Sequence, residues 1–345
     1  MREWTVKREE KEQRFNKYLQ RRLPDAPSSF LYKMLRKKNI TLNGKKASGS
    51  ELLQQGDLVT LFLSDETIAK FGGAAQTPDA GKCGGEEELE TGEYTRAFRQ
   101  LRGRIGEDGI LYEDGHILAV RKPVGLLSQK ASDSDLSMNE WLVGYLLEKG
   151  AVSARSLKSY KPSVCNRLDR NTGGILICSK SLAGARKAAE LLRNRTMRKF
   201  YNAVVLGKVD RSGKIEGYLK KDAVTNTVNF KNKAEKGADW TRTVYRPLTG
   251  GSKCTLLELE LITGKTHQLR SHLAASGHPI LGDPKYGDLK VNEKIRSEYG
   301  LRGQMLWCCR IEFPRMEEEE FAALSERVIT CDPPSIYREI AAREK

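Results

Sequence analysis

The chain has 345 residues, of which 39% are hydrophobic and 30% are charged, a balance typical of globular rather than disordered proteins. No apolar run approaches the roughly 18 residues that a membrane-spanning helix needs, and the N-terminal segment lacks the apolar centre of a signal peptide. We therefore expect a cytoplasmic protein with no membrane partner. Its 60 Lys and Arg exceed its 45 Asp and Glu by 15, and such an excess favours nucleic acid as a partner.

The cysteines and histidines do not indicate a metal site. The seven cysteines are odd in number and include no Cys-x-x-Cys pair, so neither a disulfide framework nor a structural zinc site is expected. His267 and His272 are five residues apart, whereas a spacing of four would place two ligands on one helical face. The sequence predicts reduced cysteines that mostly pack in the core, and no bound metal.

Residues 12–63 are predicted to form a small domain that begins with two helices. Apolar side chains recur at helical spacing within residues 15–19 and again within residues 30–35. The segment Pro27-Ser28-Ser29 supplies a capping signal just before the second of these stripes.

Short strands and a basic cluster complete this domain. Residues 40–42 predict a strand, Asn43-Gly44 a tight turn, and residues 58–63 another strand. Residues 1–63 carry 14 Lys and Arg against 7 Asp and Glu. A basic cluster can contact several phosphates, and each contact adds affinity by releasing counterions. The cluster that we expect to bind RNA consists of Lys33, Arg36, Lys37, Lys38, Lys45 and Lys46.

Two segments outside the structured zones show no sustained apolar period. Residues 64–109 are rich in Gly, Ala and acidic residues, which predicts a linker with a short helix around residues 94–101. Residues 316–345 are expected to form a C-terminal tail, in which residues 317–328 predict a short helix.

Residues 110–315 alternate strand and helix signals and are predicted to form the main domain. Leu182, Ala185, Ala189 and Leu192 define one face of a helix. A second helix is expected over residues 267–276, closed by a glycine. The predicted strands are 115–123, 175–178, 199–209 and 255–263. Strands outnumber long helices, so the fold class is α+β, with a large mixed, mainly antiparallel sheet and flanking helices.

Polar segments at strand ends carry the residues that favour chemistry. In NRLDRNTGGILIC (166–178), Arg167 and Asp169 precede a buried strand, where a charged group is costly to desolvate unless it is paired or functional. In residues 261–287 a strand turns into a helix that begins with basic and polar side chains, and backbone N–H groups at a helix start favour anions.

Three segments, in chain order, resemble one family. Residues 166–174, NRLDRNTGG, resemble the HRLDxxTSG motif of the RluA-type pseudouridine synthases. Residues 200–209, FYNAVVLGKV, resemble that family's K-x-Y-x-A-x-V-x-G strand. Residues 263–287 resemble its TGRTHQIRxHLAxxGHPIxGDxxYG block. Residues 12–63 are similar to the S-four-type RNA-binding domain found in the branch that modifies large-subunit ribosomal RNA. The resemblance covers nearly the whole chain apart from the linker and the tail.

The chain departs from the family motifs at four positions. Asn166 stands for His, Gly173 for Ser, Lys265 for Arg, and Arg121 for the Asn of an NKP turn. The first two lie beside the Asp169 loop, so they bear on rate and substrate choice more than on the class of reaction.

The resemblance implies a set of catalytic residues. Asp169 is the catalytic carboxylate, and three routes stay open for it: attack on the sugar, attack on the uracil ring, or removal of a sugar proton. Arg270 would keep this carboxylate ionised in a pocket of low dielectric. Tyr201 would stack on the flipped base and is a candidate for the final proton removal.

Other side chains are expected to contact the RNA. A target base must leave its stack at a cost of about a few kcal/mol, and Arg167 would fill the vacated space. Lys265 and His267 either contact RNA or only orient the strand-to-helix turn. Tyr286 and Trp307 are predicted to be core residues.

The sequence therefore predicts an RNA pseudouridine synthase that needs no cofactor, because the reaction involves neither redox change nor group transfer. Large-subunit ribosomal RNA is the expected substrate, and the protein is expected to act as a monomer. Two alternatives stay open: the same chemistry on transfer RNA, and a non-catalytic RNA-binding protein that keeps the fold.

Overall fold

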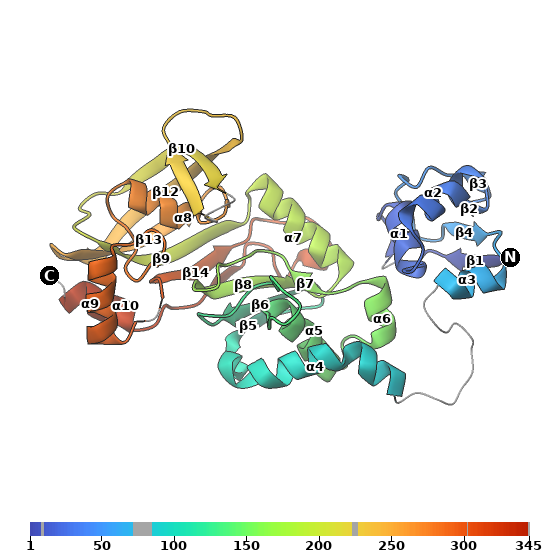
Figure 1. Cartoon of the computed structure of the whole chain (residues 1–345), viewed down its shortest axis with the longest axis horizontal. Coiled ribbons are helices and arrows are strands. Elements are labelled where there is room, and N and C mark those ends of the chain that lie inside the picture. The colour runs from blue at the N-terminus through green and yellow to red at the C-terminus, as the bar shows by residue number, and fades with distance from the viewer. Residues whose placement is uncertain (8–9, 72–84, 223–226, 302, 344–345) are drawn as a thin grey trace. The chain divides into compact units, whose positions relative to one another are not determined.

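The computed structural model describes residues 1–7, 10–71, 85–222, 227–301 and 303–343 (Figure 1). Cys83 and the central part of the predicted linker lie outside these ranges. The chain divides into two units, which are described separately. The first unit comprises Met1–Arg96, Val143–Pro162 and Ser181–Ala183. The second unit comprises Ala97–Leu142, Ser163–Lys180 and Gly184–Lys345.

A small antiparallel sheet forms the centre of the first unit. Its described strands are ordered β1-β4-β2-β3 and span Arg2–Thr5 (β1), Ile40–Leu42 (β2), Lys45–Lys46 (β3) and Leu58–Leu61 (β4). Helices α1 (Phe15–Arg22) and α2 (Ser28–Arg36) share one buried apolar core with these strands. The core includes Phe15, Tyr18, Leu19, Leu31, Leu35, Ile40 and Val59.

The predicted helices, strands and turn of this unit are confirmed, with two corrections. Asn43 and Gly44 both adopt positive φ, 50° and 70°, as a tight hairpin turn prefers. The capping prediction at Ser28 was wrong: α2 begins at that residue, and its hydroxyl accepts a hydrogen bond from the Gln20 amide at 2.9 Å. The sheet also starts earlier than residue 12, because β1 pairs along β4 from Arg2.

Parts of the predicted linker are helical. Helix α3 (Asp65–Phe71) follows β4, buries Ile68, and places the Phe71 ring 4.6 Å from that of Phe30. Helix α4 (Gly85–Ile105) extends the predicted short helix at both ends. The last part of α4 buries Ala97, Phe98, Leu101 and Ile105, so its apolar period continues beyond the predicted end. Apolar contacts therefore order segments whose overall composition suggested a linker.

The second unit is organised around a sheet of 11 described strands. Nine follow the order β11-β10-β12-β13-β9-β14-β8-β6-β5, with β15 paired to β14 and β7 to β8. The described pairings are antiparallel except that of β14 with β8. The strands are β5 (Ile110–Glu113), β6 (Ile117–Lys122), β7 (Ser163–Val164), β8 (Gly173–Ser179), β9 (Arg198–Leu206), β10 (Gly213–Asp222), β11 (Thr227–Lys231), β12 (Ala238–Gly250), β13 (Cys254–Leu261), β14 (Leu306–Glu312) and β15 (Val328–Thr330). The predicted α+β class with a mainly antiparallel sheet is confirmed.

The remaining helices are divided between the two units, and one predicted helix face was wrong. The described helices beyond α4 are α5 (Met138–Glu148), α6 (Ala154–Ser159), α7 (Leu182–Asn194), α8 (Gln268–Ala275), α9 (Leu289–Tyr299) and α10 (Ile336–Arg343). The buried face of α7 contains Gly184, Lys187, Ala188 and Leu191, whereas Ala189 is exposed. Gly184 approaches the backbone closely, since an added Cβ would lie 2.3 Å from the carbonyl oxygen of His116.

The predicted tail belongs to the second unit. Instead of the expected helix over residues 317–328, the chain forms a short 3₁₀ turn at Glu319–Phe321 and then β15. Helix α10 follows, and its Ile340 carbonyl lies 3.6 Å from the Cys254 thiol of β13. Among the described residues, none of the helices combines the length and apolarity needed to cross a bilayer.

Candidate active site

Asp169 lies in the loop between β7 and β8, and hydrogen bonds hold this loop on both sides. The Ser128 hydroxyl accepts from the Leu168 N–H at 3.0 Å and donates to the Leu168 carbonyl at 2.9 Å. The Thr172 N–H donates to the Asp169 carbonyl at 3.0 Å, and the Gln304 amide donates to the Thr172 hydroxyl at 2.7 Å. The carboxylate is 31% exposed, so it is held in place while a ligand can still reach it.

Lys122, at the end of β6, ties the Asp169 loop to the sheet. Its fully buried ammonium donates to the carbonyls of Pro123, Leu126 and Arg170 at 3.1, 2.7 and 3.1 Å, which uses all three of its protons. Burial lowers the pKa of Lys122 to about 7, and the Asp169 charge opposes part of that fall. Sequence reasoning missed this residue, although it stands in the strand-ending Arg-Lys-Pro turn.

Arg270 of α8 joins two carboxylates. Its guanidinium donates to Asp169 at 2.8 Å and makes a two-pronged contact with Asp283 at 2.7 and 2.8 Å. Arg270 is 5% exposed and Asp283 is fully buried. Burial alone would lower the pKa of Arg270, but the bonds and charges of Asp283 and Asp169 raise it overall. The expected pairing of Asp169 with Arg270 is present, whereas Asp283 had no role assigned to it within the family block at residues 263–287.

His267 and Tyr286 border this ion pair. His267 occupies the N-cap of α8 in the left-handed conformation, with φ 51°. The Tyr286 hydroxyl accepts from the Val228 N–H at 2.7 Å and shares a second hydrogen bond, of 3.0 Å, with His267 Nδ1. Burial lowers the pKa of His267, and its Nε2 lies 3.8 Å from the Asp169 carboxylate. Tyr286 is thus a site residue as well as a packing residue, since its ring also lies 5.1 Å from the Arg270 guanidinium carbon.

Tyr201 lies in the middle of β9 and is 5% exposed. It pairs in register with Leu259 of β13 and Cys308 of β14. Burial raises the pKa of Tyr201 well above its ordinary value, and the Cys308 thiol and the Asp169 charge add to the rise. The charge of Asp169, which Arg270 binds, thus reaches Tyr201, and Tyr201 keeps its proton at neutral pH.

The departures from the family motifs have local explanations. A Cβ on Gly173 would lie 2.3 and 2.5 Å from carbons of the Trp307 ring, so the indole occupies the space of the usual serine side chain. Trp307 is core, as expected, and its N–H donates to the Cys331 carbonyl at 2.9 Å. The Asn166 amide oxygen accepts from the Ile177 N–H at 2.7 Å, which joins the loop to β8. Arg121 pairs with Asp108 at 2.7 Å.

Lys265 and Arg167 have more open surroundings. The Lys265 ammonium is 45% exposed and contacts the Asp239 carboxylate at 2.9 Å. Arg167 is exposed and directly precedes the pinned Leu168. Both are accessible to a polyanionic ligand, and neither belongs to the Asp169–Arg270–Asp283 ion network.

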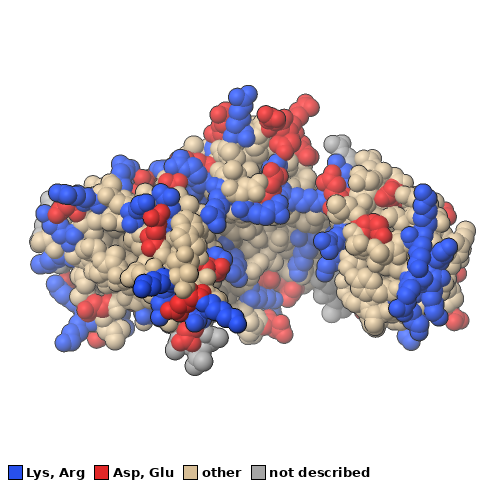
Figure 2. Space-filling model, turned by 90° about the horizontal axis from the view of Figure 1, so that it is seen from above, with Lys and Arg blue, Asp and Glu red and all other residues tan. Residues whose placement is uncertain are grey.

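The basic cluster belongs to the first unit, and all six of its predicted members are exposed: Lys33, Arg36, Lys37, Lys38, Lys45 and Lys46. Figure 2 shows Lys and Arg gathered in a band over the unit at its right. The first four members lie in or directly after α2, and the last two form β3. This unit therefore presents cations with open access to solvent.

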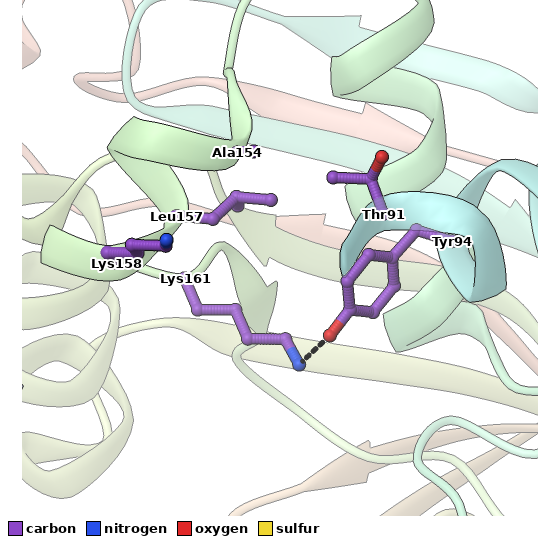
Figure 3. A pocket seen from close by; sticks show the side chains of 6 residues that line it. All are labelled: Thr91, Tyr94, Ala154, Leu157, Lys158 and Lys161. Carbon is purple, nitrogen blue, oxygen red and sulfur yellow. Dashed lines mark hydrogen bonds between the residues drawn. The ribbon is translucent and has the colours of Figure 1, made fainter. Parts of the chain in front are cut away.

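A cavity of about 240 Å³ lies in the first unit between α4 and α6 (Figure 3). The Lys161 ammonium donates to the Tyr94 hydroxyl at 2.5 Å and lies 4.6 Å from the centre of its ring. The other lining residues are Thr91, Ala154, Leu157 and Lys158. None of the predicted site residues lines it. Among the described residues, no cluster of three or more His, Cys, Asp or Glu is suited to a metal ion.

Comparison with known proteins identifies the family. The family model described as RNA pseudouridylate synthase matches residues 116–275. Ribosomal large subunit pseudouridine synthase C of Rickettsia felis is 31% identical over 280 residues, which cover 81% of this chain and 83% of that protein. The protein of the same name from Vibrio parahaemolyticus is 27% identical over 318 residues, with 91% of this chain and 88% of that protein covered.

Solved structures share the fold. Human RNA Pseudouridylate Synthase Domain Containing 4 aligns with 74% of this chain and 97% of its own, with a TM-score of 0.55 and 22% identity. Human RNA Pseudouridylate Synthase Domain Containing 1 aligns with 68% of this chain and 86% of its own, with a TM-score of 0.50 and 21% identity. Because the Rickettsia relative is aligned over most of both chains, the chain belongs to the RNA pseudouridylate synthase family and is an isomerase that acts on RNA.

Proposed function

We propose that the chain converts specific uridines of large-subunit ribosomal RNA to pseudouridine, with Asp169 as the catalytic carboxylate. The observation that carries this proposal is the partly exposed Asp169 carboxylate held at 2.8 Å by the buried guanidinium of Arg270. The proposed choice of RNA is supported by the relatives, whose names specify the ribosomal large subunit.

The reaction breaks the bond between the sugar C1′ and uracil N1 and forms a bond from C1′ to C5. C5 loses its proton, and N1, which carries none in uridine, gains one in the product, so no proton or electron is gained or lost overall. Asp169 acts on the sugar or on the base, while Arg270 keeps it ionised as surrounding water is excluded. Tyr201 packs against the flipped base, a contact worth about 1–3 kcal/mol, and Arg167 fills the gap left in the RNA stack.

His267 and Tyr286 position the carboxylate. The hydroxyl of Tyr286 directs the neutral His267 ring so that its Nε2 proton faces Asp169, which restricts where the carboxylate can turn. Lys122 also restrains the Asp169 loop, since its ammonium joins the carbonyl of the neighbouring Arg170 to those of Pro123 and Leu126.

The first unit is proposed to act as an S-four-type RNA-binding domain. Its exposed Lys and Arg contact phosphates without reading sequence, and they increase affinity through counterion release. Target selection then depends on the second unit, where the flipped nucleotide meets Asp169.

Pseudouridine mapping tests this function with the Asp169→Asn variant. Large-subunit ribosomal RNA and transfer RNA transcripts are incubated with wild type, with Asp169→Asn, and with the matched control Asp288→Asn. Asp288 is an exposed N-cap of α9, where Asn caps as well as Asp. We expect wild type and the control to modify ribosomal RNA, and Asp169→Asn to bind it without modifying it.

Each other outcome has a distinct meaning. Equal modification by Asp169→Asn and wild type would remove Asp169 from the chemistry. Modification of transfer RNA alone would overturn the ribosomal substrate but keep the catalytic assignment. Binding without modification by the wild type on both transcripts would favour the non-catalytic alternative.

A further inference from the structure

Lys199 is a buried cation on the same face of β9 as Tyr201. Side chains two residues apart in a strand point to the same face of the sheet, and both residues lie within β9; the register irregularity beside them falls between Cys308 and Arg310 of β14. Lys199 is 7% exposed and pairs in register with Ile311, while Tyr201 pairs with Cys308. The ammonium therefore belongs to the sheet face that carries the proposed base-stacking tyrosine.

Within the described part of the chain, Lys199 has no hydrogen-bond or ion-pair partner, unlike the other buried lysines. Lys122 donates to three carbonyls, and Lys187 contacts the carboxylates of Glu190 and Glu318. The acids nearest in register to Lys199 are engaged on the opposite face, where Arg198 binds Glu260 and Glu312 at 2.8 Å each. The Lys199 Nζ is not among the fully buried nitrogens without a partner, so this ammonium keeps contact with solvent, from which an anionic ligand can reach it.

A second cation, Arg195, lies close to Lys199. Burial lowers the pKa of Lys199, the Cys308 thiol opposes this effect, and the Arg195 guanidinium adds to it. Arg195 follows α7 in the left-handed conformation, with φ 61°, and is exposed. The Arg195 guanidinium is thus close enough to Lys199 to act on its charge.

We propose that Lys199 binds a phosphate of the RNA strand at the target nucleotide, with Arg195 assisting from the solvent side. This inference rests on the proposed function, because it takes the flipped nucleotide to lie over Tyr201. Each nucleotide carries one phosphate, and a nucleotide stacked on Tyr201 brings its own phosphate within reach of a side chain two residues along the strand. Because most of the Lys199 side chain is buried, its ammonium is held in place before the phosphate arrives, so little side-chain freedom is lost on binding.

The first experiment compares Lys199→Met with Lys187→Met as the matched control. Both changes remove a buried ammonium, but only Lys187 leaves carboxylates behind. RNA binding to a large-subunit ribosomal RNA fragment is measured against salt concentration, and thermal unfolding is measured in parallel. We expect Lys199→Met to keep or raise Tm, to lose roughly 10- to 100-fold in RNA affinity, and to lower the salt slope by about 0.7–0.9. Lys187→Met should lower Tm and leave the affinity unchanged.

The second experiment removes charge from the RNA instead of the protein. A single neutral methylphosphonate is placed at successive phosphates around the modified uridine. At one position, wild type should lose roughly 10- to 100-fold in affinity, while Lys199→Met loses no more than about twofold. A lysine with only a structural role would not make the effect of a methylphosphonate at one RNA position depend on whether residue 199 is Lys or Met.

Other outcomes overturn the assignment. An unchanged affinity and salt slope in Lys199→Met, or equal losses in both proteins at every methylphosphonate position, would exclude the phosphate contact. A fall in Tm together with affinity would indicate a structural lysine. A fall in kcat with KM unchanged would place Lys199 at the reacting atoms instead. The first experiment needs only RNA binding, so it stays decisive for Lys199 even if the wild type forms no pseudouridine.

Discussion

Replacing Asp283 by Asn should destabilise the fold far more than replacing Asp169, although Asp169 carries the proposed chemistry. Asp283 is fully buried and supplies two of the three charge-assisted hydrogen bonds to Arg270. Asp169 supplies the third and is 31% exposed. The two variants therefore separate Asp283, which fixes the Arg270 guanidinium in place, from Asp169, the carboxylate that this guanidinium keeps ionised.

The magnitude follows from the burial of the pair. Removing one partner of a buried ion pair leaves the other charge uncompensated, which costs about 3–5 kcal/mol. An asparagine at position 283 keeps an oxygen for the N–H groups of Lys285 and Tyr286, so the turn itself is preserved. Asp169→Asn should cost only about 1 kcal/mol, because water and Asp283 still compensate Arg270. Since domains are stable by about 5–15 kcal/mol, Asp283→Asn should remain folded but clearly weakened.

Urea unfolding at neutral pH measures both variants, with Asp288→Asn as the exposed control. Equal m values are required, so that the midpoints report stability. Pseudouridine formation is measured on the same preparations. We expect Asp169→Asn to lose activity while nearly keeping its midpoint, and Asp283→Asn to lose several kcal/mol. A loss below about 1 kcal/mol for Asp283→Asn would refute the claim that this carboxylate compensates a buried charge.

Three further variants address packing, protonation and RNA binding. Gly173→Ser should destabilise the fold by about 1–3 kcal/mol because the serine Cβ would clash with the Trp307 ring. In a double-mutant cycle measured by unfolding, the same change should cost less in a Trp307→Leu background. Equal costs in both backgrounds would contradict this clash. Burial lowers the pKa of His272 to about 4 from 6.5, so the folded protein binds this proton more weakly than the unfolded chain. The associated stability of about 3 kcal/mol is complete above pH 6.5 and is lost as the pH falls towards 4. In urea unfolding, the free energy of unfolding of His272→Asn should therefore fall less steeply over this range than that of wild type. Parallel pH profiles of the two proteins would exclude this contribution of His272. Replacing Lys45 and Lys46 by Gln should lower the salt slope of RNA binding by about 1.5, and an unchanged slope would make them a solvated surface only.

Local patterns were sufficient for much of the fold. The helices at residues 15–22 and 28–36, the Asn43-Gly44 turn and the long strands were predictable because period and turn chemistry are properties of short segments. The face of α7 was predicted wrongly for a non-local reason. Its buried side includes Lys187, which no hydrophobic pattern selects, and Glu318 of the distant tail satisfies that ammonium.

The motifs likewise determined the central residues of the proposed site. Asp169, Tyr201 and Arg270 could be selected from the sequence because their neighbours form recognisable segments, and the pairing of Asp169 with Arg270 is present at 2.8 Å. Asp283, Tyr286 and Lys122 were missed or treated as core because their significance depends on what faces them. A carboxylate or an ammonium gains a role when burial removes its water and a particular partner replaces it.

The sequence by itself determined the fold class, the family motifs and the basic surface of the first unit. Only the tertiary structure decided which charges are compensated: Arg270 reaches an aspartate 101 residues away, Lys122 binds a carbonyl 48 residues away, and Lys199 keeps no partner within the described chain. The physical reason is that desolvation and pairing are properties of a folded interior, where side chains distant in sequence share one region of low dielectric.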